Sequence, residues 1–161
     1  MSVGIGYDIH KLSNEGIMTL GGIEIKNMPA FKAESDGDVI MHSIIDALLG
    51  ASNKILGNHA DISDYFTKNS SDEKQNSQEI LKSIINDINS IKKIDINNLD
   101  ILILAKKPNI KKIKYEIIEN IVNIFKISHA QVSIKGKTNN EVGEIGQGKA
   151  VACMTIIQLN D

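Results

Sequence analysis

Residues 35–50 constrain the fold of this chain more than any other stretch. They read Ser-Asp-Gly-Asp-Val-Ile-Met-His-Ser-Ile-Ile-Asp-Ala-Leu-Leu-Gly, and Ser35 followed three residues later by Asp38 is a helix-start signal. On such a helix Asp38, His42 and Asp46 are spaced four apart and share one face, while the aliphatic residues between them form a core face. A polar stripe on an apolar helix predicts a site. The simpler alternative is that Asp38 caps the helix and His42 is a hydrogen-bonded core histidine.

Composition sets bounds on the function. A chain of 161 residues is expected to form a single domain spanning 1–161. The net charge of −2 gives no sign of a nucleic-acid partner. Without a leader or an apolar run long enough to span a bilayer, we expect a cytoplasmic protein with no membrane partner. The single cysteine, Cys153, is expected to be a small buried hydrophobe. All 18 basic residues are Lys, so a bound phosphate must be held by metal, backbone N–H groups, Lys or hydroxyls.

The periodicity of the remaining chain predicts strands interleaved with helices. Five segments read as strands, namely residues 2–10, 18–25, 99–105, 131–135 and 150–159. Besides the helix that should end at Gly50, amphipathic helices are expected from Asn76 and over 110–125, and the polar residues 57–76 should form a long surface loop. This order predicts an α+β sandwich, in which a mixed sheet carries helices on one face.

The beginning of the chain supplies partners for His42. In the predicted strand Asp8 and His10 are two residues apart, so their side chains lie on one face. Two imidazoles and one carboxylate, with a fourth position open, are the ligand pattern of a catalytic zinc site. We therefore predict that Asp8, His10 and His42 bind Zn²⁺ or another divalent transition metal.

Two further pairs of residues support that site. Asp38 and Asp46 are expected to orient His42 and its neighbours as outer-shell groups. Gly4 and Gly6 indicate that another backbone segment approaches the strand closely. They are not a dinucleotide-binding fingerprint, because its third glycine is missing.

A glycine-punctuated loop at 136–148 is a candidate for phosphate binding. Its backbone N–H groups, Lys137 and the Thr138 hydroxyl could meet a phosphate. It is not a P-loop, because no glycine stands five residues before Gly136. A turn-rich connection is the alternative.

These motifs together resemble the 2-C-methyl-D-erythritol 2,4-cyclodiphosphate synthase family. The resemblance rests on Gly-Tyr-Asp-Ile-His at 6–10, on Ser-Asp-Gly-Asp with His42 and Asp-Ala-Leu-Leu-Gly-Ala at 35–51, and on Lys-Gly-Lys-Thr at 135–138. It implies a homotrimer with three sheets around its axis and active sites between subunits. It also implies conversion of a CDP-linked methylerythritol 2-phosphate to a cyclic diphosphate and CMP, with zinc on the triad and Mg²⁺ or Mn²⁺ on the diphosphate.

The resemblance also assigns substrate contacts. Phosphate contacts are implied for Ser35, Lys137, Thr138, Asn140 and Glu141, methylerythritol and ribose contacts for Asp61, Ser63 and Phe66, and cytosine contacts for Ala105, Asn109, Ile110 and Lys111.

The chain departs from the family pattern at several of these positions. Glu34 replaces a His, Ser63 replaces a Gly, and Gln147 replaces an Arg that lines the trimer cavity. The loop acid of the family is shifted from 140 to 141, so either Asn140 faces the second metal or the loop bulges to bring Glu141 inward. A metal-dependent phosphoester hydrolase and a non-catalytic trimer that binds metal and cytidine nucleotide are therefore alternatives to the synthase.

Overall fold

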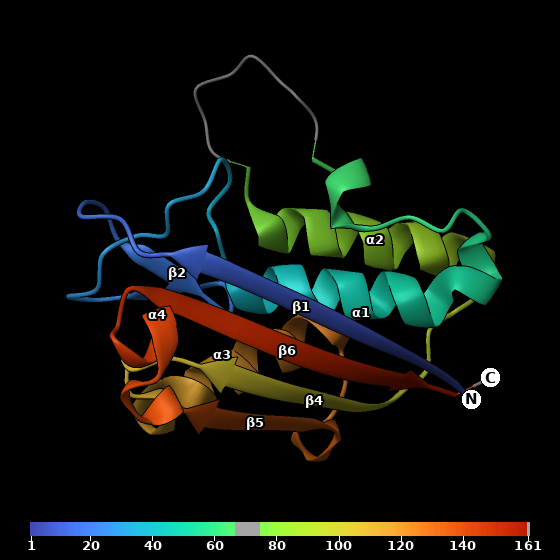
Figure 1. The fold of residues 1–161 in the computed structure, drawn as a ribbon. Helices are drawn as coiled ribbons and strands as arrows, with labels where there is room; N and C mark the ends of the chain where they lie inside the picture. Colours follow the sequence, from blue (N-terminus) through green and yellow to red (C-terminus); the bar gives the residue numbers. More distant parts are fainter. Residues whose placement is uncertain (67–74, 161) are drawn as a thin grey trace.

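A mixed four-stranded sheet forms the framework of the computed structural model, which describes residues 1–66 and 75–160 (Figure 1). Its strand order is β1-β6-β4-β5, and β2 and β3 form a separate hairpin. The elements are β1 (Ser2–Lys11), β2 (Met18–Leu20), β3 (Ile23–Ile25), α1 (Val39–Leu56), η1 (Ile62–Asp64), α2 (Ser77–Ile91), β4 (Ile96–Leu104), α3 (Ile110–Phe125), η2 (His129–Gln131), β5 (Val132–Lys137), η3 (Asn139–Glu141), α4 (Gly143–Gly146) and β6 (Ala150–Leu159).

The pairing of the strands explains why the sheet is mixed. β6 pairs antiparallel with β1 and with β4, whereas β4 and β5 run parallel. Parallel neighbours need a crossover connection, and α3 supplies it between β4 and β5. The predicted α+β class with a mixed sheet is confirmed.

The close approach of α1 to β1 depends on two glycines. A Cβ atom at Gly4 would lie 1.9 Å from the carbonyl oxygen of Ala47, and one at Gly6 would lie 2.0 Å from that of Ser43. No larger side chain fits there without moving the helix, so the predicted close backbone approach is confirmed.

α1 begins and ends later than the sequence predicted. Its N-cap is Asp38 rather than Ser35, and it runs through Gly50 to the left-handed cap at Gly57. Burial of Ala51 and of neighbouring side chains against the core outweighs the weak helix propensity of Gly50. By length and composition α1 could cross a membrane, but two thirds of it (67%) is buried inside the fold, as in a core helix.

The predicted strand over 18–25 is also wrong, because the structure has a hairpin there. Gly21 and Gly22 have φ angles of 66° and 76° and form the turn between β2 and β3. The Asp38 carboxylate accepts hydrogen bonds from both glycine N–H groups, at 2.9 and 2.6 Å. One side chain therefore caps α1 and fastens the hairpin to it.

The long helices lie on one side of the sheet. α1 packs on β1 and β6, α2 packs on α1, and α3 packs beside β5. The predicted helix start at Asn76 is confirmed, as is the predicted helix over 110–125, whose N-cap is Asn109. The short α4 is the exception, because its Ile145 packs on Leu104 and Ala152 at one end of the opposite face.

Asp38→Ala should lower the free energy of unfolding by about 1–3 kcal/mol, because it removes a helix cap and leaves buried N–H groups without acceptors. Denaturant unfolding measures the loss. Asp87→Ala, at an exposed position in α2, is the matched control and should change stability by no more than about 0.5 kcal/mol. Equal effects of the two substitutions would contradict this role for Asp38.

Candidate metal centre

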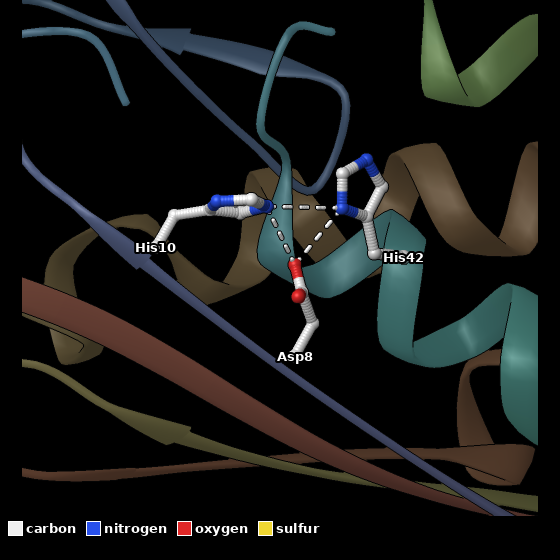
Figure 2. A group of neighbouring side chains, drawn as sticks. All are labelled: Asp8, His10 and His42. Atoms are coloured by element: carbon white, nitrogen blue, oxygen red, sulfur yellow. Dashed lines mark hydrogen bonds and ion pairs between the residues drawn. The ribbon is translucent and has the colours of Figure 1, made fainter. Parts of the chain in front are cut away.

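Three ligand atoms from two elements meet at one end of β1. The Asp8 Oδ2 atom lies 3.1 Å from His10 Nε2 and 2.9 Å from His42 Nδ1, and the two histidine nitrogens are 3.4 Å apart. Figure 2 shows the three side chains pointing toward one another. The structure thus brings together the three residues that the sequence singled out, and they form a possible metal-binding site.

The local structure explains this convergence. Asp8 and His10 lie two apart on β1, and His42 lies one turn into α1, where its backbone N–H donates to the Asp38 carbonyl oxygen. The contact of α1 with Gly6 holds the start of the helix directly over the strand. His42 is 5% exposed, so its ring is fixed by packing as well as by polar contacts.

The geometry of the donor set fits a tetrahedral metal. With zinc bonds of about 2.0–2.2 Å, neighbouring ligand atoms in a tetrahedron lie roughly 3.3 Å apart. The observed separations of 2.9, 3.1 and 3.4 Å are close to that value.

The charges of the triad also favour a cation. Burial alone would raise the pKa of Asp8, but hydrogen bonds to His10 and His42 lower it well below its usual range, so the carboxylate is ionised. The hydrogen bond that His10 donates to the Asp8 carboxylate raises the pKa of His10 against the effect of burial. An ionised carboxylate beside two imidazoles therefore gives the triad an electrostatic preference for a positive charge.

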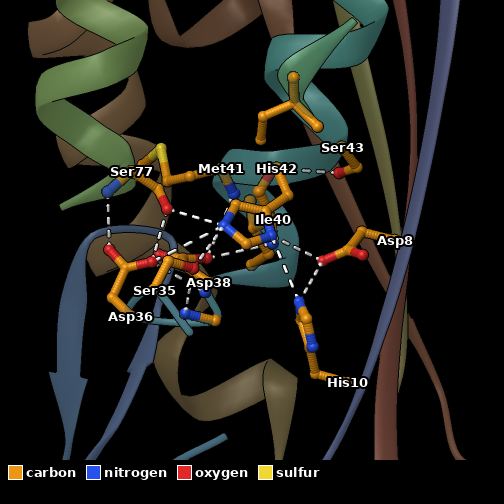
Figure 3. Close-up of polar contacts among 12 residues, drawn as sticks. Asp8, His10, Ser35, Asp36, Asp38, Ile40, Met41, His42, Ser43 and Ser77 are labelled. Carbon is orange, nitrogen blue, oxygen red and sulfur yellow. Dashed lines mark hydrogen bonds and ion pairs between the residues drawn. The ribbon is translucent and has the colours of Figure 1, made fainter. Parts of the chain in front are cut away.

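Two residues that the sequence analysis missed contact the other side of the His42 ring. Its Nε2 atom lies 2.8 Å from Ser77 Oγ and 3.8 Å from Asp36 Oδ1 (Figure 3). Asp36 stands within the motif that was recognised, but Ser77 is 35 residues from His42 and no local pattern links them. The predicted phosphate contact Ser35 is also near, with Oγ 3.4 Å from Nε2.

The predicted roles of Asp38 and Asp46 need correction. The Asp38 carboxylate binds backbone N–H groups at the helix start and hairpin instead of the His42 ring. Burial raises its pKa to about 6, and the hydrogen bonds from Gly21 and Gly22 act against that rise. Asp46 accepts a hydrogen bond from Ile62 N at 2.9 Å and so ties η1 to α1. Burial raises the pKa of Asp46 as well.

The predicted methylerythritol and ribose contacts divide into two groups. The Phe66 ring lies 5.4 Å from the His42 ring and is part of the metal centre's surroundings. Asp61 caps η1 and accepts from Ser63 N and Oγ, which lowers the pKa of Asp61. Both residues are exposed. The stretch 67–74 of the predicted loop lies outside the described residues.

The predicted cytosine contacts meet elsewhere, together with the predicted phosphate contacts Lys137 and Thr138, in a cavity of about 270 Å³ at the ends of β4 and β5. It is lined by Ala105, Lys106, Pro108, Asn109, Ile110, Lys111, Lys114, Ile134, Gly136, Lys137 and Thr138. Four of these residues are Lys, and none of the described lining residues is acidic, so the cavity favours an anion.

The loop that carries Asn140 and Glu141 is not extended as the sequence analysis assumed. Asn139, Asn140 and Glu141 all have positive φ angles, of 61°, 44° and 66°, within η3. A one-residue shift therefore does not simply turn a side chain to the opposite face. The Thr138 hydroxyl lies 3.3 Å from the side-chain oxygen of Asn140, which keeps Asn140 beside the predicted phosphate contact.

Comparison with known proteins identifies relatives over the whole chain. The YgbB family model matches residues 1–160. A 2-C-methyl-D-erythritol 2,4-cyclodiphosphate synthase of Treponema denticola is 38% identical over 155 residues, which cover 96% of this chain and 92% of that protein. The bifunctional enzyme IspD/IspF of Pelagibacter ubique is 39% identical over 95% of this chain, which spans 40% of that longer relative.

Solved structures share the fold. IspF of Plasmodium falciparum, solved as a CDP complex, superposes with a TM-score of 0.81 at 40% identity and covers 98% of this chain and 94% of its own. A more distant synthase structure superposes with a TM-score of 0.84 at 18% identity, over 98% of this chain and 99% of its own.

Zinc affinity should fall as the pH falls, because protons compete with the metal for neutral imidazole nitrogens and the pKa of His10 is raised. We expect a loss of about tenfold or more between pH 8 and pH 6 in a chelator competition assay. His129→Asn, at an exposed histidine paired with Glu119, should leave this pH profile unchanged. An affinity that is independent of pH would contradict the site.

Proposed function

The chain belongs to the YgbB family, and we propose that it is a 2-C-methyl-D-erythritol 2,4-cyclodiphosphate synthase, a lyase of non-mevalonate isoprenoid biosynthesis. The observation that carries the proposal is the triad of Asp8, His10 and His42, whose ligand atoms have the spacing of a tetrahedral site. It occurs in a chain that is 38% identical to a synthase over 96% of its length.

Asp8, His10 and His42 would hold Zn²⁺ or another divalent transition metal. When bound, the metal supplies a Lewis acid that polarises a phosphoryl oxygen. Mg²⁺ or Mn²⁺ would accompany the substrate diphosphate, for which Asn140 offers a neutral amide oxygen and Glu141 a carboxylate.

The substrate would be a CDP-linked methylerythritol 2-phosphate. An oxygen of the 2-phosphate forms a bond to the β-phosphorus while the bond from that phosphorus to the bridging oxygen breaks, and CMP leaves with the bridging oxygen. Such in-line transfer depends mainly on positioning and on neutralising charge. Ser35, Thr138 and Lys137 would bind phosphate oxygens.

The lysine-lined cavity would hold the cytidine part of the substrate. Ala105 and the segment 109–111 would offer backbone groups to cytosine. The four positively charged Lys side chains would neutralise the negative charge of the departing CMP. Phe66 would line the methylerythritol pocket beside His42, and Asp61 with Ser63 would meet the ribose.

A homotrimer is part of the proposal, because the two halves of this site are far apart in one chain. β1 carries Asp8 and His10, and β5 carries Lys137, at opposite edges of the sheet. Three strand spacings, or about 14 Å, separate these edges. A neighbouring copy could bring its cavity to the metal centre.

The outer face of the sheet supports this assembly. Val3, Ile5, Tyr7 and Ile9 on β1 are between 44% and 63% exposed, and Ile156 on β6 is 41% exposed. Adjacent apolar side chains on a face that the long helices leave uncovered are typical of an interface between protein chains. The proposal also includes a cytoplasmic location, which suits a chain whose most apolar helix is packed in its own core.

The purified protein, with Zn²⁺ and Mg²⁺, should convert the CDP-linked 2-phosphate to the cyclic diphosphate and CMP, as measured by phosphorus NMR. Asp8→Asn should lower turnover by about 100-fold or more, because loss of an outer-shell partner alone typically costs about 10–100-fold. An open monophosphate with CMP would instead indicate a hydrolase. Nucleotide and metal binding without turnover would indicate a non-catalytic protein.

Ile5→Lys should dissociate the trimer, because a charge on the outer sheet face cannot be buried without a partner. Light scattering at micromolar concentration measures the mass. Tyr115→Lys is the control, since Tyr115 is 69% exposed but lies on α3, away from that face. A monomeric wild type, or a trimer that survives Ile5→Lys, would contradict the proposed interface.

A further inference from the structure

The two nitrogens of the His42 ring have different partners. Nδ1 faces Asp8 and His10, whereas Nε2 lies 2.8 Å from the hydroxyl of Ser77, the first residue of α2 (Figure 3). Ser77 is fully buried, so water does not compete for this contact. The ring is thus held from the side opposite the other two ligands.

The proton of the Ser77 hydroxyl is already committed. Ser77 Oγ donates to Asp36 Oδ1 at 2.5 Å. Because a hydroxyl has one proton, its oxygen must accept the hydrogen bond from His42, and Nε2 must carry the hydrogen. The lone pair of neutral His42 is then on Nδ1, which is the tautomer that a metal needs, and the Ser77 contact favours it over the alternative in which Nδ1–H donates to the Asp8 carboxylate 2.9 Å away.

Asp36 is itself held from both helix starts. Its Oδ2 accepts from Ser77 N at 2.8 Å, and its Oδ1 accepts from Asp38 N at 3.1 Å. The carboxylate therefore has one orientation available. It sits 3.8 Å from His42 Nε2, near enough for its charge to favour a ring that donates through Ser77.

Ser35 is a weaker candidate for the same task. Its hydroxyl oxygen lies 3.4 Å from Nε2 and accepts from Gly37 N at 3.1 Å. Ser77 Oγ is closer to Nε2, at 2.8 Å, and Ser77 also donates to a charged partner, the Asp36 carboxylate.

We propose that Ser77 and Asp36 are positioning residues for the metal centre, which fix the tautomer and orientation of His42 through the chain His42 Nε2–H, Ser77 Oγ–H, Asp36 carboxylate. This inference rests on the proposed metal site. It joins the first residue of α2 to a candidate ligand on α1, and neither Ser77 nor Asp36 belongs to the triad. Outer-shell partners of this kind typically contribute about 10–100-fold to metal affinity.

The test compares Ser77→Ala, Asp36→Asn and Ser77→Thr with the wild type. Zinc affinity from chelator competition should fall about 10–100-fold in Ser77→Ala and in Asp36→Asn, and Ser77→Thr should restore it because the hydroxyl is kept. Ser90→Ala is the matched control, since Ser90 lies in α2 with an exposed hydroxyl that donates to the Asp87 carbonyl oxygen.

Ring ¹H–¹⁵N correlation spectra of the metal-free protein give the second readout. At a pH where His42 is neutral, the wild type should show hydrogen on Nε2, and Ser77→Ala should show a mixture of tautomers. Zinc affinity within about twofold of the wild type together with an unchanged tautomer in Ser77→Ala would overturn the inference. If the wild type binds no zinc, the proposed metal site fails, while the tautomer spectra still decide the role of Ser77.

Discussion

The contact between α1 and β1 is the constraint on which the rest of the structure depends. Gly4 and Gly6 allow helix carbonyl groups to lie where a Cβ atom would be. A larger side chain at either glycine would lift the helix, and His42 would then move away from Asp8 because one comes from the helix and the other from the strand. The geometry of the metal centre is therefore set by backbone packing, and the polar contacts refine it.

Two carboxylates of the segment before α1, Asp36 and Asp38, bind different neighbouring elements. Asp38 is fully buried and accepts hydrogen bonds from backbone N–H groups of both elements, so it stabilises the junction of α1 with the hairpin. Asp36 is partly buried and binds the start of α2 through Ser77. Together they tie the segment before His42 to the hairpin, to the start of α1 and to the start of α2. The ring therefore has little freedom to leave the site.

Periodicity and local signals were enough for most elements and for the triad. The alternation in 2–10 and the four-residue spacing around His42 report directly on faces, so Asp8, His10 and His42 could be placed together before any coordinates. Local signals failed where tertiary packing decides. Burial carried α1 through Gly50, and the hairpin at 18–25 depends on acceptors supplied by Asp38. Ser77 could not be found, because its link to the site exists only once α2 packs on α1.

The absence of Arg shapes what the proposed site can do. Lys is a mobile point charge and cannot fix a phosphate by two parallel hydrogen bonds as a guanidinium does. Four Lys around the cavity can thus neutralise a nucleotide, but its orientation must come from rigid groups such as the backbone at 105–111 and the hydroxyl of Thr138. Those groups sit at the end of β4 and β5, while the triad sits on the far edge at β1. In the proposed homotrimer, separate copies of the chain would hold the two edges in register and align a phosphoryl group between them. Exposed apolar residues lie on the β1 and β6 part of the outer sheet face, where such an assembly would form.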